Sequence, residues 1–279
     1  MDDKLAKLRS IVRGMDRVMV AYSGGVDSTF LLRVVSEEIG NRAVALTIRS
    51  PTAAEDEFAD AEAMARSFGV EHLVVDSNEL TIPGYAANPV NRCYLCKDNL
   101  FVVCEAEATR RGIPVVLDGV NLDDLGDYRP GLKAADEHMV RHPLVEAELR
   151  KQEIRELSRA LGLSTWDKPA SPCLSSRFPY GTTITLERLS SVGNAEKVLR
   201  EHGFRNCRVR FHEQVARIEV PVDDLPRLLE EPRRSEIVAA LKALGFLYVT
   251  VDLQGFRSGS LNEALRPEAI VPNRDPLAS

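Results

Sequence analysis

Long apolar runs are absent from this 279-residue chain. A membrane-spanning helix needs about 18 or more consecutive apolar residues, so the sequence predicts no membrane span. Residues 1–13 are charged and amphipathic and lack the apolar centre of a secretory signal. We therefore expect a cytoplasmic protein.

An excess of positive charge is also absent. Lys and Arg total 36 against 42 Asp and Glu, which gives a net charge of -6. Binding to a nucleic-acid backbone depends on Lys and Arg displacing counterions. The charge balance therefore argues against a nucleic-acid partner, although it does not exclude a tRNA-modifying enzyme.

Cysteine is scarce, and its number is odd. An odd count in a chain of this length argues against a disulfide framework. In a reducing compartment, such cysteines more often lie in the core, bind metal or act in catalysis. The five are Cys93, Cys96, Cys104, Cys173 and Cys207.

Short apolar runs alternate with segments of helical periodicity through the first part of the chain. This alternation predicts βαβ units, and so an α/β, Rossmann-like parallel sheet with helices on both faces. The expected strands are 17–22, 43–48, 73–75 and 115–117. One expected helix ends at Ile39, and the others are 53–68, 96–111 and 151–161.

A segment rich in proline and serine, 168–181, interrupts this pattern and marks the end of the first domain. We place the domains at 1–176 and 177–279. The second, smaller domain has an α+β pattern. Its expected helices are 186–202 and 233–244, and its expected strands are 206–211, 216–220 and 246–253, with a turn at Glu213.

The segment Ser23-Gly24-Gly25-Val26-Asp27-Ser28 lies between a predicted strand and a predicted helix. Paired glycines let the backbone approach a ligand closely, and a helix N-terminus favours phosphate. Asp27 would repel bare phosphate, so we expect it to meet Mg²⁺ or to order the loop. No Gly-Lys-Ser/Thr follows, so this is not a Walker loop. The alternative is a Gly-Ser turn in an unrelated sheet protein.

The loop resembles the PP-loop of ATP pyrophosphatases, which split ATP between the α and β phosphates and form an adenylated intermediate. The resemblance implies that Ile48 lies near the adenine. Ligands of such sheets bind at the carboxyl ends of the strands, so the segment after the fourth strand would face the same cleft. The implied ATP-binding residues are Ser23, Gly24, Gly25, Asp27, Ser28, Ile48, Asp118 and Gly119.

Cys173 lies in a predicted loop, with Lys168 and Arg177 on either side. Nearby cations stabilise a thiolate and so increase the reactive fraction of a cysteine. A structural loop cysteine is an equally good interpretation of this pattern alone.

Taken together, several motifs resemble the LarE family. They are the segments 23–28, 91–94, 118–124, 127–131 and 169–181. Members are ATP-dependent sulfur transferases that adenylate the carboxylates of pyridinium-3,5-biscarboxylic acid mononucleotide and convert them to thiocarboxylates, for the nickel-pincer cofactor of lactate racemase. The resemblance implies an adenine nucleotide alpha hydrolase-like fold and a homo-oligomer. In one branch a loop cysteine gives up its sulfur and becomes dehydroalanine, and Cys173 matches that position.

Cys93 and Cys96 form a Cys-x-x-Cys pair, predicted to lie just before a helix. Two thiolates at this spacing can share a metal, and Cys173 could supply a third ligand. The three cysteines resemble a LarE-like branch in which a [4Fe–4S] cluster carries an extra sulfide, and we favour this interpretation over a sacrificial Cys173. Zinc with a fourth ligand, or a Cys93/Cys96 pair that assists sulfur relay, are the alternatives. The sequence around Cys104 and Cys207 favours core burial.

The implied substrate is anionic, and arginine binds carboxylates and phosphates in bidentate fashion. Arg208 and Arg210 alternate along a predicted strand and so share a face. By resemblance they belong, with Glu196, to the substrate or phosphate region; a solvated strand face is the alternative. Further substrate candidates are Tyr94, Asp124, Arg129 and Arg177. Tyr94 could stack on the pyridinium ring or simply pack, and the segment 256–262 suggests no chemistry.

Three other function classes use a similar nucleotide loop. A tRNA thiolase would need a basic RNA surface, an amide synthetase would need an ammonia source, and a nucleotide-binding sensor would release no pyrophosphate. We favour a carboxylate that attacks the α-phosphorus of ATP and a sulfur nucleophile that then displaces AMP.

Overall fold

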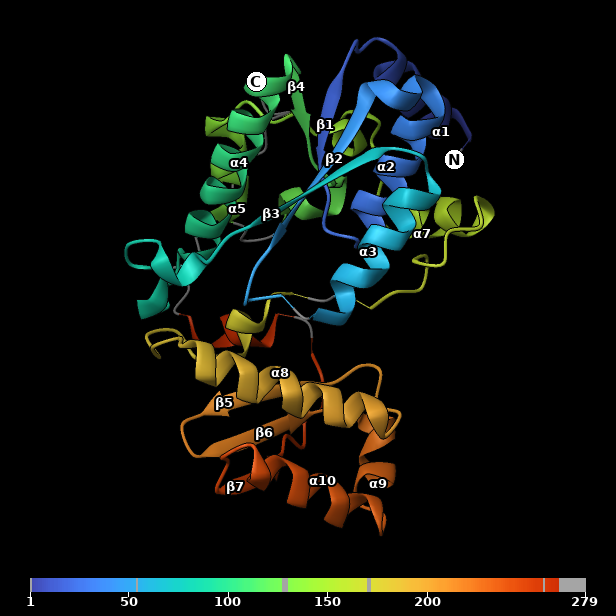
Figure 1. The fold of residues 1–279 in the computed structure, drawn as a ribbon. Coiled ribbons are helices and arrows are strands. Elements are labelled where there is room, and N and C mark those ends of the chain that lie inside the picture. The colour runs from blue at the N-terminus through green and yellow to red at the C-terminus, as the bar shows by residue number, and fades with distance from the viewer. Residues whose placement is uncertain (1, 54, 127–129, 170–171, 258, 266–279) are drawn as a thin grey trace.

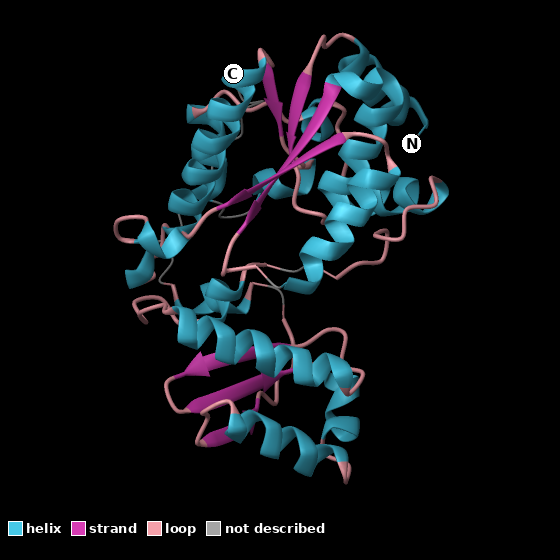
Figure 2. Ribbon diagram, in the orientation of Figure 1, coloured by secondary structure: helices cyan, strands magenta, loops and turns pink. Residues whose placement is uncertain are grey.

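The computed structural model describes residues 2–53, 55–126, 130–169, 172–257 and 259–265. Two sheets, each covered by helices, follow one another along the chain (Figures 1 and 2). Arg129, one of the predicted substrate residues, lies outside the described residues. In the described part of the chain, no helix has both the length and the apolar character to cross a membrane.

The first sheet has four parallel strands in the order β3-β2-β1-β4. They are β1 (Val18–Ala21), β2 (Ala43–Arg49), β3 (Glu71–Asp76) and β4 (Val115–Leu117). The chain moves from β1 outward to β3 and then crosses to β4 on the other side of β1. The strand order therefore reverses between β1 and β4, which is where open parallel sheets bind ligands. The predicted α/β fold is confirmed.

Helices cover both faces of this sheet (Figure 1). One face carries α1 (Asp2–Arg13), α2 (Val26–Ile39), α3 (Glu55–Ser67) and α7 (Lys151–Ala160), and the other carries α4 (Arg92–Arg111) and α5 (Pro130–Glu137). Alternate β1 side chains supply the two cores, because Val18 and Val20 pack with α2 while Met19 packs with Phe101 of α4. A short helix, α6 (Pro143–Glu146), precedes α7.

The second sheet has the order β5-β6-β7, with β5 and β6 antiparallel and β6 and β7 parallel. The strands are β5 (Arg208–His212), β6 (Val215–Glu219) and β7 (Tyr248–Val251). Helices α8 (Leu186–Glu201) and α10 (Arg233–Ala243) share its core, and α9 (Leu225–Leu228) is a single turn. The expected turn at Glu213 is present, with φ 55°. The predicted α+β pattern is therefore observed, while the division at residue 176 stays a prediction.

The predicted helix 96–111 was wrong at its start. Helix α4 begins at Arg92, so Cys93 and Cys96 lie within its first two turns and not ahead of it. Asn91 is a residue type that favours the N-cap, a signal that the sequence prediction did not use, although its side chain makes no capping bond here. Tertiary contacts fix the first turn instead, because the buried Arg92 side chain donates to Asn88 and to the carbonyl of Ser175.

The core of the first sheet offers a direct test of the fold. Leu32 of α2 is fully buried. We expect Leu32→Ala to lower the free energy of unfolding by about 2–5 kcal/mol, because it removes buried methyl groups and leaves a cavity. Leu253→Ala is the control: Leu253 is 86% exposed, and we expect a change within about 0.5 kcal/mol. Urea unfolding followed by circular dichroism measures both, and equal losses would contradict the assigned core.

Candidate active site

The phosphate loop joins β1 to α2 in a tight turn. Gly24 has φ 70°, a conformation that favours glycine. The Ser23 and Ser28 hydroxyl oxygens lie 3.0 Å apart, and the Gly25 N–H donates to Ser23 Oγ at 3.4 Å. No side chain caps α2 at Gly25. The first N–H groups of α2 are therefore available to an anion, which the helix dipole also favours.

Gly119, after β4, lies directly against this loop. A Cβ at this position would be 2.8 Å from the Ser28 nitrogen and 3.2 Å from the Asp27 carbonyl carbon. The structure thus brings the predicted residues of the β1 and β4 loops together at the point where the strand order reverses. Only a residue without a side chain permits this approach.

Asp118, beside Gly119, is buried and has two polar partners. Its Oδ1 lies 2.6 Å from His142 Nδ1 and accepts from the Val120 N–H at 3.1 Å. Burial lowers the pKa of His142, but the hydrogen bond to Asp118 and its charge outweigh this effect, so the pKa is raised. Asp118 is therefore held rigidly beside the phosphate loop.

Asp124 and Ile48 lie near the same edge of the sheet. Asp124 is buried, and its Oδ2 accepts from the Asn121 N–H at 3.0 Å, so it shapes the turn after β4. Ile48 pairs with Val75 close to the carboxyl end of β2 and packs against the core. Contacts of Asp124 with substrate and of Ile48 with adenine stay predictions.

Asp27, in the first turn of α2, forms an ion pair across the cleft. Lys151 Nζ of α7 lies 2.6 Å from its Oδ2. Its Oδ1 is buried and has no partner among the described residues. A buried carboxylate oxygen without a partner calls for a ligand, and carboxylates are the oxygen ligands that Mg²⁺ takes from proteins. This geometry fits the predicted magnesium role.

The three predicted ligand cysteines come together from two segments. Cys93 and Cys96 are one turn apart on α4, and Cys173 directly precedes a 3-10 turn, Leu174–Arg177. One polar contact joins these segments: Arg92 Nη1 of α4 donates to the Ser175 carbonyl at 3.0 Å. The Ser175 hydroxyl also lies 2.9 Å from that of Tyr85, in a 3-10 turn before α4.

The effect of Cys173 on the pKa values of Cys93 and Cys96 also indicates that the three thiols lie near one another. Desolvation and then Cys173 raise the pKa of Cys93, and the same two causes raise that of Cys96 to about 12. Both thiols are therefore protonated at neutral pH unless a cation binds them. Over the residues that the structure describes, no three Cys, His, Asp or Glu side chains are already arranged as a metal site.

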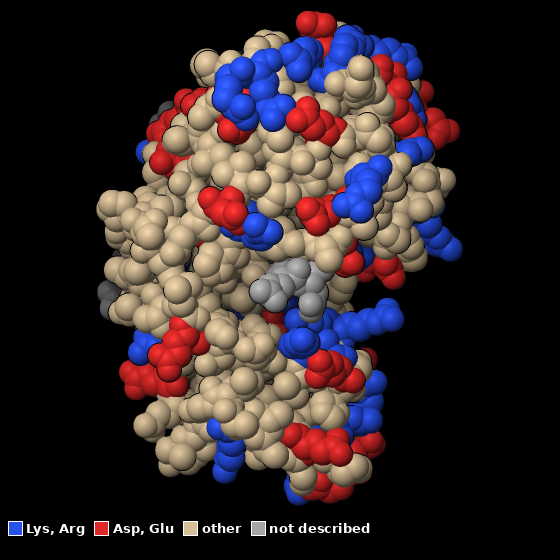
Figure 3. Space-filling model, in the orientation of Figure 1, with Lys and Arg blue, Asp and Glu red and all other residues tan. Residues whose placement is uncertain are grey.

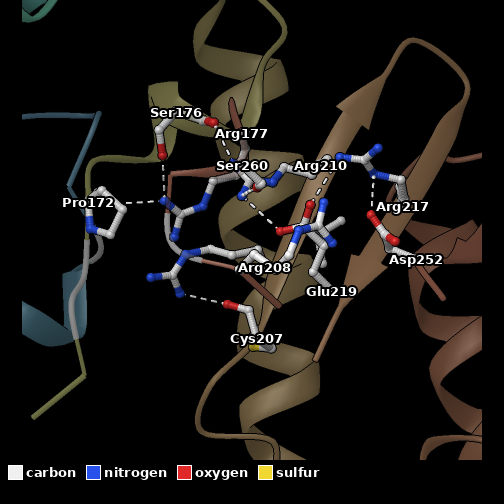
Figure 4. Close-up of polar contacts among 12 residues, drawn as sticks. Pro172, Ser176, Arg177, Cys207, Arg208, Arg210, Arg217, Glu219, Asp252 and Ser260 are labelled. Atoms are coloured by element: carbon white, nitrogen blue, oxygen red, sulfur yellow. Dashed lines mark hydrogen bonds and ion pairs between the residues drawn. The ribbon is translucent and has the colours of Figure 1, made fainter. Parts of the chain in front are cut away.

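The two cations that flank Cys173 in the sequence both have hydrogen-bond partners in the structure, and their role as stabilisers of a thiolate stays a prediction. Lys168 Nζ donates to the Gly24 carbonyl at 3.3 Å. Arg177 is 2% exposed and forms a two-pronged ion pair with Glu196 of α8, with distances of 2.7 and 2.9 Å. Its third nitrogen donates to the carbonyl of Pro172 (Figure 4). The same nitrogen donates to the carbonyl of Cys173. Arg177 therefore fixes the cysteine loop and does not lie open to a ligand.

Arg208 and Arg210 point from β5 toward the same place (Figure 4). Both are buried, so the alternative of a solvated strand face was wrong. Arg210 donates to Glu219 at 2.8 Å and to the Ser176 carbonyl at 2.8 Å. Burial and then repulsion from Arg177 lower the pKa of Arg208 to about 10. We call Arg177, Arg208 and Arg210 the arginine cluster.

A hollow of about 260 Å³ opens beside the arginine cluster, with Arg177, Arg210 and His212 in its lining. Ser260 and Leu261 line one side of the hollow; they belong to the segment 256–262, to which the sequence assigned no chemistry. Ser260 Oγ accepts from Arg210 at 2.9 Å, and Asn262 Oδ1 accepts from the Tyr180 hydroxyl at 3.0 Å. Cationic groups around a hollow of this size suit an anionic group of a small molecule.

Tyr94 faces α5. Its hydroxyl donates to Glu137 Oε2 at 2.6 Å, and Lys133 Nζ lies 5.5 Å from the centre of its ring. These contacts favour the packing interpretation of Tyr94 over stacking on the substrate, which stays a prediction.

Comparisons with known proteins agree with this arrangement. A family model described as asparagine synthase matches residues 9–120. The chain is 39% identical, over 94% of its length and 95% of the relative's, to the pyridinium-3,5-bisthiocarboxylic acid mononucleotide synthase of Lactiplantibacillus plantarum.

The chain belongs to the LarE family. It is also 47% identical to an uncharacterized protein of Synechocystis, over 95% of this chain and 99% of that one. A third relative, an uncharacterized protein of Methanocaldococcus jannaschii, is 31% identical over 91% of this chain and 98% of its own. LarE membership and the PP-loop domain make this protein an ATP-dependent enzyme.

The sequence missed several residues that build the LarE site here. Lys151, His142 and Arg92 each hold a predicted residue or segment in place. No local motif marks Lys151 or His142, because each acts on a partner far away in the chain. Arg92 lies in the motif 91–94, but the motif did not indicate its contact with Ser175. Only the helical spacing of α7 could have suggested that Lys151 lies at the start of a helix that faces the sheet.

Gly119 provides the test of the assembled phosphate loop. We expect Gly119→Ala to weaken the binding of a non-hydrolysable ATP analogue about tenfold or more, because the new Cβ would displace the first turn of α2. Gly14→Ala is the control, since its Cβ would lie 3.4 Å from the nearest atom. Titration calorimetry measures both, and unchanged affinity in Gly119→Ala would place the nucleotide elsewhere.

Proposed function

We propose that this protein is an ATP-dependent sulfur transferase that converts the carboxylates of pyridinium-3,5-biscarboxylic acid mononucleotide to thiocarboxylates. The observation that carries the proposal is the segment 168–177. It contacts the phosphate loop through Lys168, holds Cys173 next to Cys93 and Cys96, and ends in Arg177 of the arginine cluster. The name of the Lactiplantibacillus plantarum relative supports the choice of substrate.

The first step is adenylation at the phosphate loop. A carboxylate oxygen of the substrate attacks the α-phosphorus, and the bond from this phosphorus to the bridging oxygen breaks. Pyrophosphate leaves with the electron pair. The uncapped N–H groups of α2 and the hydroxyls of Ser23 and Ser28 donate to the phosphate oxygens as charge develops on them. Asp27 would hold Mg²⁺, which neutralises phosphate charge when bound.

The second step transfers sulfur. A sulfur nucleophile attacks the carbonyl carbon of the acyl adenylate, and AMP leaves with the electrons of the carbon–oxygen bond. Arg208 and Arg210 of the arginine cluster bind the anionic groups of the substrate, so that the activated carboxyl faces the cysteines. Residues of this chain thus bind, orient and activate the substrate in one continuous site.

Cys93, Cys96 and Cys173 would hold a [4Fe–4S] cluster through three thiolates. Such a cluster has one iron without a protein ligand, which supplies a place for exogenous sulfide. The three thiols are the type of ligand that an iron–sulfur cluster takes. Burial and then Cys173 raise the pKa of Cys93 and Cys96, and a bound cation would favour their thiolate forms. The alternative is a Cys173 that gives up its own sulfur.

Other function classes receive less support. A tRNA thiolase needs a basic surface, yet acidic and basic side chains are interspersed over the face in Figure 3 and the net charge is -6. An amide synthetase or a nucleotide sensor would leave the three gathered cysteines without a role. Assembly into a homo-oligomer and a cytoplasmic location stay predictions.

Pyrophosphate release tests the proposed reaction. With ATP, Mg²⁺ and the biscarboxylate mononucleotide under anaerobic conditions, we expect release of pyrophosphate and AMP that depends on the carboxylate substrate. Ser28→Ala should slow it about 10²-fold, because one donor to the phosphate is lost. Ser67→Ala, on the exposed end of α3, should have no effect. Pyrophosphate release that does not depend on the carboxylate substrate, or no release at all, would contradict the proposed function.

Iron content tests the sulfur source. After anaerobic reconstitution with iron and sulfide, we expect about four iron atoms per chain and loss of this iron in Cys93→Ala. Cys104→Ala is the control, because Cys104 lies on the same helix but is buried in the core. A reacted protein that has lost one sulfur from Cys173, with no iron bound at any stage, would show the sacrificial route.

A further inference from the structure

A buried threonine of β2 contacts the backbone just before the phosphate loop, and the two steps above do not use it. Thr47 is 5% exposed, and its hydroxyl donates to the Tyr22 carbonyl at 2.7 Å. Tyr22 follows the end of β1 and directly precedes Ser23. Thr47 shares a face of the sheet with Ala45, two residues earlier, and this is the face that α2 covers. A side chain of the neighbouring strand therefore reaches the first peptide of the loop.

The peptide between Tyr22 and Ser23 has a partner for each of its polar groups. Its carbonyl accepts from Thr47, and its N–H, which belongs to Ser23, donates to Ser28 Oγ at 3.3 Å. Because a trans peptide is planar, its C=O and N–H point in opposite directions. The contact with Thr47 on one side therefore ensures that an N–H, and not a carbonyl oxygen, faces Ser28 on the other side.

His72 of β3 orients the Thr47 hydroxyl. Its Nε2 lies 2.8 Å from Thr47 Oγ1. A hydroxyl has one hydrogen, and a carbonyl oxygen can only accept, so the contact with Tyr22 uses the hydrogen of Thr47 and His72 must donate from Nε2. Burial lowers the pKa of His72, so its ring is neutral at pH 7 and carries a single hydrogen. The ring also packs edge-on against that of Tyr22, with centroids 5.6 Å apart, and this contact holds it in place.

The direction of this peptide determines what the Ser28 hydroxyl can do. Because Ser28 Oγ accepts from the Ser23 N–H, its own hydrogen is left for an acceptor. Ser23 Oγ at 3.0 Å and the Gly25 carbonyl at 3.3 Å are within reach, and a phosphate oxygen is a stronger acceptor than either because it is charged. If the peptide were turned over, the Tyr22 carbonyl would face Ser28 and accept the hydrogen that the phosphate needs.

We propose that Thr47 is a positioning residue for ATP and that His72 orients its hydroxyl. Both act through the peptide between Tyr22 and Ser23, so that Ser28 presents its hydrogen to a phosphate oxygen. This inference rests on the proposed function, in which Ser28 donates to the phosphates. Thr47 and His72 form no bond to the nucleotide. They fix the direction of a donor before the nucleotide arrives, so that charge on the phosphate is stabilised without rearrangement of the loop.

Titration calorimetry with a non-hydrolysable ATP analogue tests this role on the full-length protein. Thr47→Val keeps the shape of the side chain and removes its hydroxyl. We expect about tenfold weaker binding, because a hydrogen bond to a charged group is lost. Thr47→Ser should restore most of the affinity, because the hydroxyl returns. Thr250→Val is the matched control and should bind normally: Thr250 of β7 also donates to the carbonyl of a neighbouring strand, that of Ala216 at 3.2 Å, but in the second sheet.

A second substitution, Ser28→Ala, separates positioning from a general effect on the fold. If Thr47 acts through Ser28, Thr47→Val should weaken binding about tenfold when Ser28 is present and less than about twofold in the Ser28→Ala protein. His72→Phe keeps a ring and removes the Nε2 donor. It should weaken binding several-fold with the same dependence on Ser28, and it keeps the inference testable should Thr47→Val not fold, as judged by circular dichroism.

The inference is wrong if Thr47→Val binds the analogue as tightly as the unsubstituted protein, or if its effect is the same with and without the Ser28 hydroxyl. Unchanged binding in His72→Phe would contradict the part assigned to His72. Failure of the proposed function looks different, because the unsubstituted protein would then release no pyrophosphate with the carboxylate substrate, whatever residue stands at position 47.

Discussion

The buried ion pair between Arg177 and Glu196 sets the geometry on which the rest of the site depends. Both side chains are 2% exposed, and Arg177 also donates to the carbonyls of Pro172 and Cys173. Glu196 in turn accepts from the Val209 N–H of β5 at 3.0 Å. Through Glu196, one guanidinium therefore fixes the cysteine loop to α8 and to β5, the strand that carries Arg208 and Arg210. Loss of either partner would leave a buried charge uncompensated, at a cost of about 3–5 kcal/mol.

The parallel sheet positions the phosphate loop, which is the second part of the candidate site. Reversal of the strand order between β1 and β4 places two loops side by side, and Gly119 lets the β4 loop touch the first turn of α2. Lys168 contacts this loop and Arg177 pairs with Glu196 of α8, and both lie close to Cys173 in the sequence, so the proposed adenylation and sulfur transfer would take place near each other. In the proposed mechanism neither sheet alone would contain a complete site: one would bind the nucleotide, the other would supply cations for the anionic substrate, and the connecting segment would supply Cys173.

Features of the fold and the site that follow from a local sequence pattern could be predicted. The alternating apolar runs predicted the parallel sheet, and the glycine pair before a helix predicted the phosphate loop. The shared face of Arg208 and Arg210 followed from strand periodicity. The start of α4 and the partner of Arg177 could not be predicted, because both are decided by contacts between residues far apart in the chain. Arg177 looked like a substrate group, yet its charge is used by Glu196.

The central claim is that an adenylate formed at the phosphate loop faces the three cysteines. A crystal structure with a non-hydrolysable analogue of the acyl adenylate tests this most directly. We expect its phosphate-equivalent group on the Ser23–Ser28 turn and its carbonyl carbon directed toward Cys93, Cys96 and Cys173. An analogue bound away from that turn, or bound there with its carbonyl directed away from all three sulfurs, would contradict the account.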